Sequence, residues 1–284
     1  MSRRNQEYPG YGGTAYQLQR KLLVAFTILF GVFLILPLFW MVNGSLSTNA
    51  TAREIIFSPS GFTFENYIRV FQEYPAERWL LNSIIVAVAV TLFNVVFDTL
   101  AGYSLARFDY RGREKLFLLF VSTMMVPTMV LLVPLYLIIA NLGLTNTHLG
   151  LIIVFVANPF GIFLLRQHFK GMPASLGEAA RMDGCNELQV FYKIYLPQAK
   201  SAVATLTIFV FLWTWNNFEW PLIIMQTSEM YTLPVALFAL RGTYAVEWGS
   251  ILAIALILVG PILLLFIFLQ DYFEKGMTLS GMKG

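Results

Sequence analysis

Long apolar stretches separated by short polar segments dominate the pattern of this 284-residue chain. A helix that crosses a bilayer needs about 20 mostly apolar residues. By that measure the pattern predicts six spanning helices, at 22–43, 82–104, 116–139, 149–165, 203–225 and 250–270. The chain is therefore expected to be an all-α membrane protein.

Interruptions are expected in two of the six stretches. Pro127 and Pro134 lie in the third, and the sequence ANPFG at 157–161 lies in the fourth, which is also short. Such breaks are tolerated in a membrane only where neighbouring groups satisfy the freed carbonyls. We therefore expect a packed bundle rather than six independent helices.

Composition supports the membrane assignment and excludes two other classes. The chain is 57% hydrophobic and 12% charged, whereas a soluble domain carries roughly 25% charged residues. A soluble globular protein is thereby excluded. The net charge of +3 comes without the dense Lys and Arg clusters that phosphate contacts require, which argues against a nucleic-acid partner.

The distribution of positive charge predicts the orientation. Cytosolic segments of membrane proteins are enriched in Lys and Arg. If the N-terminus is cytosolic, 15 of the 19 Lys and Arg residues lie in inner segments. The four in outer segments are Arg53, Arg69, Arg78 and Arg241. Both termini are therefore expected in the cytosol, in an inner (cell) membrane.

The segments outside the six spans divide the chain. Residues 1–20 are polar and rich in Gly and Tyr, which predicts a flexible cytosolic tail before a transmembrane domain at 21–272. Residues 273–284 form a second cytosolic tail. The longest outer segment, 44–81, has room for one small helix near FTFENYIRVFQEY.

The chain lacks the residue groups that metal or redox chemistry needs. Cys185 is its single cysteine, so no internal disulfide is expected. His148 and His168 lie far apart and do not have metal-ligand spacing. No nucleophile with its base and no paired acid and base occur within the spans. We therefore expect neither a metal site nor an enzyme active site.

One polar segment between the fourth and fifth spans contrasts with the rest of the chain. This segment has the sequence SLGEAARMDGCNELQVFYKIYLP, at 175–197. The pattern predicts a first helix that begins at Pro173, just before the segment, and runs to Asp183. Gly184 would end it in a left-handed conformation, and Asn186 would cap a second helix towards Tyr195. Such a pair of amphipathic helices suits docking of a partner protein, or alternatively an interfacial position on lipid headgroups.

The same segment carries a family resemblance. Glu-Ala-Ala at 178–180, three residues, Gly184, nine residues and then Ile-x-Leu-Pro at 194–197 resembles the EAA loop of ABC importer permeases. Other stretches, among them AGYSLARFDYRGREKLF, WNNFEWPLI and GMTLSGMKG, are similar to maltose-type carbohydrate permeases, in particular to the smaller permease subunit. The resemblance covers nearly all of the chain after the N-terminal tail.

This resemblance implies an ABC type I importer permease fold, a set of partners and a coupling surface. The partners would be a second permease, a dimer of ATP-binding subunits and an extracellular or periplasmic sugar-binding protein. The EAA loop, about 173–197, would seat its first helix in the ATPase. The implied coupling residues are Leu176, Glu178, Ala179, Ala180, Met182, Asp183 and Gly184. The chain has no G-x-x-x-x-G-K-[ST] motif, so ATP and magnesium are expected on the partner ATPase and no cofactor on this chain.

Aromatic and amide side chains in the fifth and second spans are candidates for the transport path. A continuous helix over 203–225 would place Trp213, Asn216 and Trp220 on one face, although Trp also gathers at membrane interfaces and Asn joins helices. In the second span, the carboxylate of Asp98 is costly unless it pairs, for example with Arg107, or is reached by water. The candidates are Trp213, Asn216, Asn217, Trp220, Asn94 and Asp98.

The sequence thus predicts a permease subunit of an ATP-driven, binding-protein-dependent sugar importer. The substrate would be a disaccharide, an oligosaccharide or glycerol phosphate, and the absence of basic residues deep in the spans favours a neutral sugar. The alternative function is an ion-gradient-driven secondary transporter of a small polar solute. That class usually needs intramembrane ionisable residues and repeat symmetry, and only Asp98 and Glu219 are acidic candidates.

Overall fold

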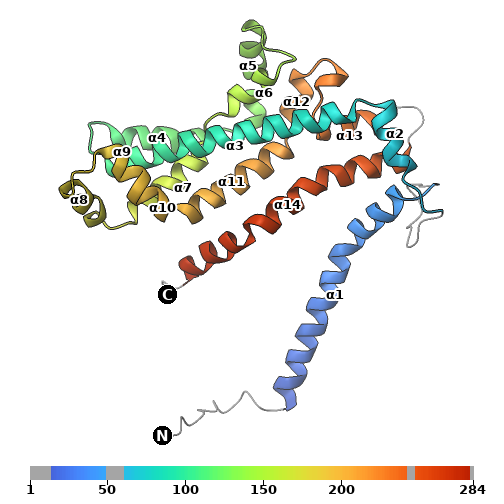
Figure 1. Cartoon of the computed structure of the whole chain (residues 1–284), viewed down its shortest axis with the longest axis horizontal. Helices are drawn as coiled ribbons and strands as arrows, with labels where there is room; N and C mark the ends of the chain where they lie inside the picture. Colours follow the sequence, from blue (N-terminus) through green and yellow to red (C-terminus); the bar gives the residue numbers. More distant parts are fainter. Residues whose placement is uncertain (1–13, 49–60, 242–246, 282–284) are drawn as a thin grey trace. The chain divides into compact units, whose positions relative to one another are not determined.

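The computed structural model describes residues 14–48, 61–241 and 247–281 (Figure 1). Regular secondary structure in these ranges is helical, apart from an isolated bridge between Ser47 and Phe62. The chain divides into two units, which are described separately. The first comprises Met1–Ile68 and Glu247–Leu256, and the second Arg69–Val246 and Ile257–Gly284.

The helices follow one another along the chain with short connections. Their bounds are α1 (Thr14–Ser45), α2 (Glu65–Glu73), α3 (Ala76–Arg107), α4 (Arg113–Thr123), α5 (Thr128–Asn141), α6 (His148–Ile152), η1 (Ile153–Phe155), α7 (Pro159–Lys170), α8 (Ser175–Met182), α9 (Glu187–Gln189), η2 (Val190–Tyr195), α10 (Leu196–Gln198), α11 (Lys200–Trp215), α12 (Glu219–Ile224), η3 (Ser228–Met230), α13 (Leu233–Arg241) and α14 (Trp248–Gly281).

Three helices are long and apolar enough to cross a membrane unbroken: Tyr16–Ser45, Ala76–Arg107 and Trp248–Phe268. Three further candidates are pairs of helices, bent by 99° between α4 and α5, 42° between η1 and α7, and 77° between α10 and α11. Counting each pair as one span gives up to six, so the six-span count stays a prediction. The all-helical fold agrees with the sequence analysis.

Two of the three bends, at 99° and 42°, lie where the sequence predicts interruptions, whereas the predicted interruption at Pro134 is absent because α5 continues through it. Pro127 precedes α5 in an extended conformation, and Pro134 lies inside α5. Asn158 is extended, with φ −125° and ψ 119°, because the following Pro159 disfavours the helical region for the residue before it. The predicted break in ANPFG is therefore confirmed.

Several helix ends differ from the predicted boundaries. The second span starts at Ala76 rather than at 82, and α1 starts at Thr14, within the predicted tail. Helix α14 continues to Gly281, so that much of the predicted C-terminal tail is helical. The small helix expected in the outer segment is α2 (Glu65–Glu73). Residues 1–13, 49–60, 242–246 and 282–284 lie outside the described residues.

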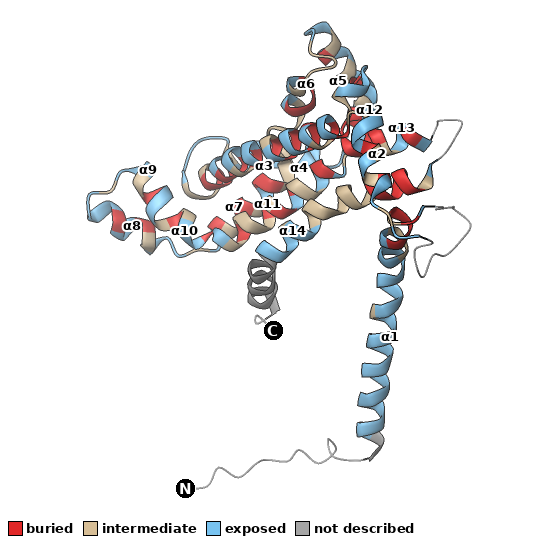
Figure 2. Ribbon diagram, turned by 45° about the vertical axis from the view of Figure 1, so that its right-hand side comes forward, coloured by how far each residue is buried: buried red, intermediate tan, exposed pale blue. Residues whose placement is uncertain are grey.

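In the first unit, one amide side chain ties α1 to the start of α2. The Asn66 side chain donates to the carbonyls of Ser45 at 2.8 Å and Ser47 at 2.9 Å. The Ser45 hydroxyl is 2.8 Å from the Tyr67 hydroxyl. A Cβ atom on Gly249 would collide with the Asn66 side chain, so this junction requires glycine at the start of α14. Most of the remainder of α1 is exposed apolar surface (Figure 2).

In the second unit, α3 packs along α7 and α11 (Figure 1). Close approach depends on small residues, as it does between membrane helices generally. A Cβ atom on Gly102 would lie 2.9 Å from both the Arg166 backbone nitrogen and Leu165 Cβ. The indole N–H of buried Trp215 donates to the Leu258 carbonyl at 2.9 Å, which joins α11 to α14.

Two polar side chains of α3 bind the backbone at the break before α7. Asn94 donates to the carbonyl of Phe155 at 2.5 Å, and the Asp98 carboxylate accepts from the Asn158 N–H at 2.9 Å. Asp98 is fully buried. The suggested pairing of Asp98 with Arg107 is therefore wrong, because the carboxylate instead accepts from a backbone N–H that the break exposes and Arg107 binds the Phe169 and Met172 carbonyls.

A Gly161→Ala substitution tests this packing. The added Cβ would overlap the Asp98 carboxylate and lie 2.8 Å from Leu206 Cδ1. We expect a loss of stability of about 1–3 kcal/mol, the usual cost of overpacking, measured as a lower midpoint of thermal unfolding in detergent. Gly171→Ala, in the same region of the chain, meets atoms only at 3.5 Å or more and serves as control. Equal midpoints for the two variants would contradict the close approach of α7 to α3.

Candidate functional site

The polar segment after α7 folds as a compact two-helix loop, as its sequence predicts. Helix α8 (Ser175–Met182) ends at Asp183, and Gly184 has φ +85°. Asn186 then begins α9 with a capping box: its side chain accepts from the Gln189 N–H at 2.9 Å, and the Gln189 side chain accepts from the Asn186 N–H at 2.9 Å. The glycine turn and the Asn186 cap are both confirmed.

The second helix of this loop departs from regular α geometry. Residues Val190–Tyr195 form a π-helical segment, η2, which the sequence analysis does not predict. Pro197 lies at the start of α10, and the chain turns by 77° before α11. Within this second helix, Phe191 and Tyr195 are buried, whereas Leu188 is 65% exposed.

The outer surface of α8 and its turn is solvent-exposed. Glu178, Ala179, Met182, Asp183 and Gly184 are all exposed, Met182 to 84%. Leu176 is half-buried. Ala180, expected on the contact face, instead packs inside the loop with 5% exposure. Five of the seven predicted coupling residues are therefore exposed. We call these five residues, Glu178, Ala179, Met182, Asp183 and Gly184, the loop surface.

An ion pair across the glycine turn holds the two helices together. The Arg181 guanidinium donates to both carboxylate oxygens of Glu187, at 2.6 and 3.1 Å. This hydrogen bonding lowers the pKa of Glu187 and raises the pKa of Arg181. The pair therefore stabilises the loop at neutral pH, and its contribution is lost as the pH falls through the lowered pKa of Glu187. Because both side chains are exposed, the contribution is small.

An aromatic cluster attaches the loop to α3 and α7. Tyr103 of α3 contacts Phe169 of α7 at 5.5 Å between ring centroids, and Phe191 and Tyr195 of η2 at 4.9 and 5.4 Å. A Cβ atom on Gly177 would lie 2.8 Å from the Tyr195 hydroxyl oxygen. Glycine at 177 therefore lets α8 lie directly against this cluster.

Arg107, the last residue of α3, binds the point where the loop begins. Its guanidinium donates to the carbonyls of Phe169 at 2.5 Å and Met172 at 2.6 Å, and lies 4.4 Å from the centroid of the Tyr195 ring. The last carbonyls of a helix have no partner within the helix, and a cation near them is favourable. This role of Arg107 is not evident from the sequence.

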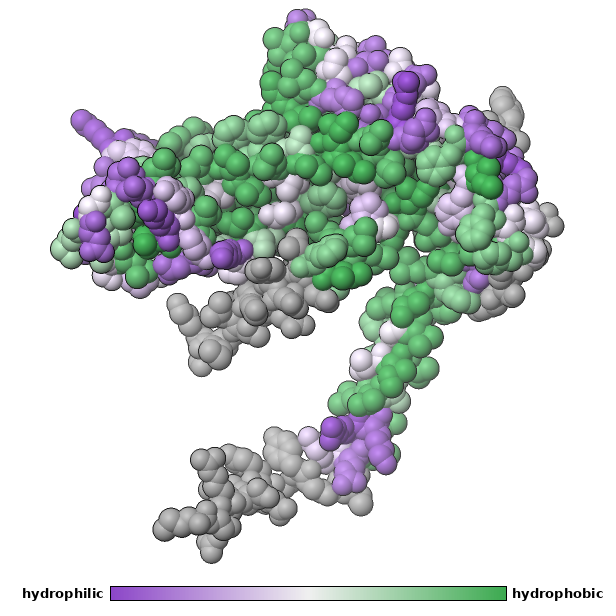
Figure 3. All heavy atoms as spheres, viewed as in Figure 1, coloured by the Kyte–Doolittle hydropathy of each residue, from purple (hydrophilic) through white to green (hydrophobic). Residues whose placement is uncertain are grey.

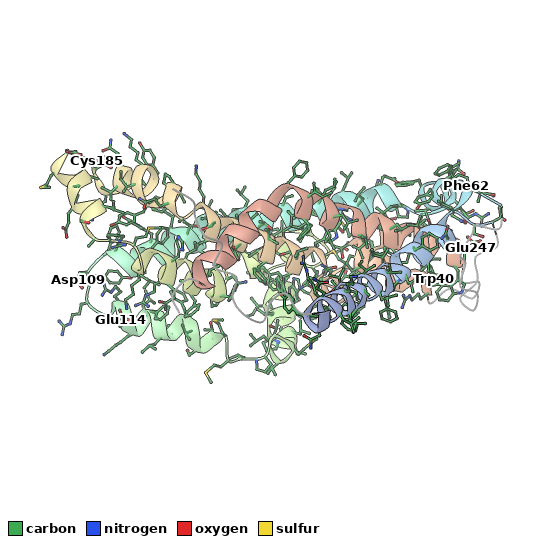
Figure 4. The ribbon with its side chains drawn as sticks, turned by 90° about the horizontal axis from the view of Figure 1, so that it is seen from below. Trp40, Phe62, Asp109, Glu114, Cys185 and Glu247 are labelled. Carbon is green, nitrogen blue, oxygen red and sulfur yellow. The ribbon has the colours of Figure 1, made fainter. Side chains whose placement is uncertain are left out.

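A second arginine joins α7 to α4 at the same end of the unit. Buried Arg166 donates to both carboxylate oxygens of Glu114, at 2.7 and 2.8 Å, and stacks 3.7 Å from the centroid of the Phe117 ring. Figure 4 shows Glu114, Asp109 and Cys185 at this end. Hydrophilic side chains gather there, and a hydrophobic band covers the middle of the unit (Figure 3).

Two cavities lie between the broken spans. The larger, of about 380 Å³, is lined mainly by residues of α5, the η1–α7 break, α3 and α11. The smaller, of about 160 Å³, shares Thr128, Phe155 and Trp213 with it and extends to α12. Aromatic faces beside amide and hydroxyl groups are the chemistry that sugar recognition uses. Several lining residues are not evident from the sequence, among them Phe155, Asn158 and Phe160.

Four of the proposed path residues line these cavities: Trp213, Asn217, Asn94 and Trp220. Trp213 is 44% exposed and lines both, with its ring against Phe155 at 4.8 Å. Asn217 lines the smaller cavity. Asn94 lines the larger one, although its amide donates to the Phe155 carbonyl.

Trp220, Asn216 and Asp98 depart from their predicted placement, although Trp220 does line the smaller cavity. The fifth span breaks between Trp215 and Glu219, so Trp213 and Trp220 are on separate helices and the predicted common face is wrong. Trp220 is 1% exposed and donates to the Gly150 carbonyl at 3.1 Å. Asn216 is exposed and donates to the Leu212 carbonyl of its own helix. Neither Asn216 nor buried Asp98 lines the two cavities.

Comparison with known proteins assigns the family. The family described as binding-protein-dependent transport system inner membrane component matches residues 99–279, more than half of the chain. The chain belongs to this family, and it is a membrane protein. The matched range contains the loop, the residues that line the smaller cavity, and the helices from α4 to α13.

Individual relatives extend the match over most of the chain. The arabinooligosaccharides transport system permease protein AraQ of Halalkalibacterium halodurans is 37% identical over 81% of this chain and 83% of its own length. The lactose transport system permease protein LacG of Rhizobium radiobacter is 33% identical over 86% and 89%. A crystal structure of a bacterial ABC transporter involved in the import of the acidic polysaccharide alginate matches with a TM-score of 0.82 and 26% identity, over 92% and 98%. The chain therefore has the fold of an ABC importer permease.

Replacing Arg107 with Met tests the attachment of the loop. The variant loses two hydrogen bonds from a charged donor, and we expect the loop to be destabilised by about 1.5–3 kcal/mol. Amide hydrogens of residues 172–184 should then exchange faster with deuterium in detergent. Arg111→Met, at an exposed residue of the next segment, is the matched control. Unchanged exchange in Arg107→Met would show that Arg107 does not hold the loop.

Proposed function

We propose that this chain is the transmembrane permease subunit of an ATP-driven, binding-protein-dependent sugar importer. It forms half of the translocation path and couples to an ATPase through the loop surface. The observation that carries the proposal is the rigid mounting of that exposed surface on α3 and α7, through Arg107 and the cluster around Tyr103. A surface built in this way transmits displacement instead of absorbing it.

The coupling role follows from the composition of the loop surface. Ala179 and Gly184 allow close backbone approach, Met182 offers an exposed apolar contact, and Glu178 and Asp183 supply charges that orient a docked partner. When ATP closes the ATPase dimer, the loop moves with it. Because Arg107 binds the carbonyls at the end of α7, the displacement reaches α3 and α7 and changes which side of the path is open.

The complex contains a second permease, a dimer of ATP-binding subunits and an extracellular or periplasmic sugar-binding protein. ATP and magnesium bind to the ATPase, since this chain lacks the phosphate-binding loop motif. Orientation follows from the Lys and Arg distribution, with both termini in the cytosol. The loop surface then faces the cytosol, where the ATPase is.

The substrate is a disaccharide or an oligosaccharide. Similar permeases are named for arabinooligosaccharides and lactose, which are neutral sugars, and the similar solved transporter for an acidic polysaccharide. The cavities supply the ring of Trp213 for stacking against a sugar face, and Asn217 and Thr128 for hydrogen bonds to hydroxyl groups. Asn94 and Asp98 also hold the break before α7 in place, and Trp220 binds the Gly150 carbonyl at the smaller cavity. The Asn216 side chain bonds to the Leu212 carbonyl at the end of α11.

A charge reversal at Glu178 tests the coupling contact. We expect Glu178→Lys to insert normally but to lose the ATP-binding subunit on co-purification from the native host, and to reduce sugar uptake by about ten-fold or more, equivalent to about 1.4 kcal/mol of contact energy. Asp109→Lys, with the same charge change at a fully exposed side chain, is the control. A wild-type chain that purifies without any ATPase would favour the secondary transporter instead.

The turn is tested at Gly184. Proline fixes φ near −65° and cannot adopt the +85° found there, so Gly184→Pro should disrupt the turn and abolish coupled uptake while leaving the chain in the membrane. Gly184→Asn should retain most of the activity, because Asn tolerates the left-handed region. Equal uptake by the two variants would mean that the turn conformation is unimportant.

A further inference from the structure

The described residues that line the two cavities include a negatively charged side chain and none that is positively charged. The residues that line them are apolar, aromatic, amide or hydroxyl side chains, with one exception, which is Glu219 in the smaller cavity. No Lys, Arg or His is among these lining residues, all of which lie in the described part of the chain. This half of the path thus presents a single negative charge and no positive one.

The helix break in the fifth span puts this carboxylate beside the aromatic residues of the cavity. Helix α11 ends at Trp215 and α12 restarts at Glu219, so Glu219 lines the same cavity as Trp213 and Asn217. Glu219 is exposed, and within the described residues its carboxylate has neither an ion pair nor a hydrogen bond. An unpaired carboxylate at a cavity wall is an acceptor that remains available to a passing solute.

Such a carboxylate acts in opposite ways on neutral and anionic saccharides. It accepts charge-assisted hydrogen bonds from sugar hydroxyl groups, which are stronger than neutral ones. A carboxylate or phosphate on the solute would be repelled, and the repulsion is strong where protein walls exclude part of the water. Because no cationic side chain is among the described lining residues, the net effect favours hydroxyl-bearing, uncharged solutes.

We propose that Glu219 is a specificity-determining residue, which makes this half of the path accept neutral saccharides and reject those that carry carboxylate or phosphate groups. The inference rests on the proposed importer function and narrows its substrate class. Glycerol phosphate and uronate oligosaccharides are then poor substrates, and neutral disaccharides or oligosaccharides are the substrates.

The test uses the complete importer in proteoliposomes, with its own binding protein. The neutral probe is arabinotriose, lactose or maltotriose, whichever the binding protein binds most tightly, and the acidic probe is the same sugar with one primary alcohol oxidised to a carboxylate. Uptake of each probe is divided by its measured occupancy of the binding protein. This correction separates the preference of the permease from that of the binding protein.

We expect wild type to take up the neutral probe about ten-fold faster than the acidic one after this correction. Glu219→Gln should bring the ratio close to one, and Glu219→Lys should invert it. Glu229→Gln removes the same charge at an exposed residue of η3 that does not line the cavities, and it should keep the wild-type ratio.

Two results would overturn the proposal, and they are distinguishable. If Glu219→Gln transports the neutral probe with an unchanged ratio, or wild type shows no preference, the selectivity role is wrong while the importer function stands. If wild type transports neither probe and loaded binding protein does not stimulate ATP hydrolysis, the proposed function itself fails.

Discussion

A peptide N–H or C=O group inside a bilayer finds no water to bind, so every break in a spanning helix needs a partner from the protein itself. In this chain those partners are a few polar side chains on continuous helices. Asn94 and Asp98 of α3 bind the backbone on either side of the break before α7. Arg107 binds the carbonyls where α7 ends. Helix α3 thereby organises the second unit through contacts that its own apolar pattern does not reveal.

This dependence on α3 connects the loop to the cavities. The helix carries Tyr103 and Arg107 beside the loop at one end and Asn94 at the wall of the larger cavity. A force applied to the loop surface acts on a helix that also lines the cavity. Because packed interfaces shift between discrete arrangements instead of deforming continuously, a small displacement of α8 is enough to re-pack the walls of the path.

The broken fifth span shows how an interruption creates a site. Had residues 203–225 formed one straight helix, Glu219 would have faced a different side from Trp213. The break after Trp215 brings both to one cavity, together with Asn217. Trp220 lines the same cavity, but it is 1% exposed and its indole N–H is bonded to the Gly150 carbonyl. Charge and stacking surface therefore meet because the helix is interrupted.

Sequence pattern alone determined the class of this protein, because hydrophobic length, charge distribution and the EAA spacing are local properties of the chain. It also located the proline breaks, the Gly184 turn and the Asn186 cap, since each follows from the conformational limits of one or two residues. Tertiary structure alone decided that Ala180 faces inward, that Asp98 binds a backbone N–H rather than Arg107, and that Trp213 shares a cavity with Glu219. These outcomes depend on which helices pack together and by how much each break bends the chain, and no local preference specifies either.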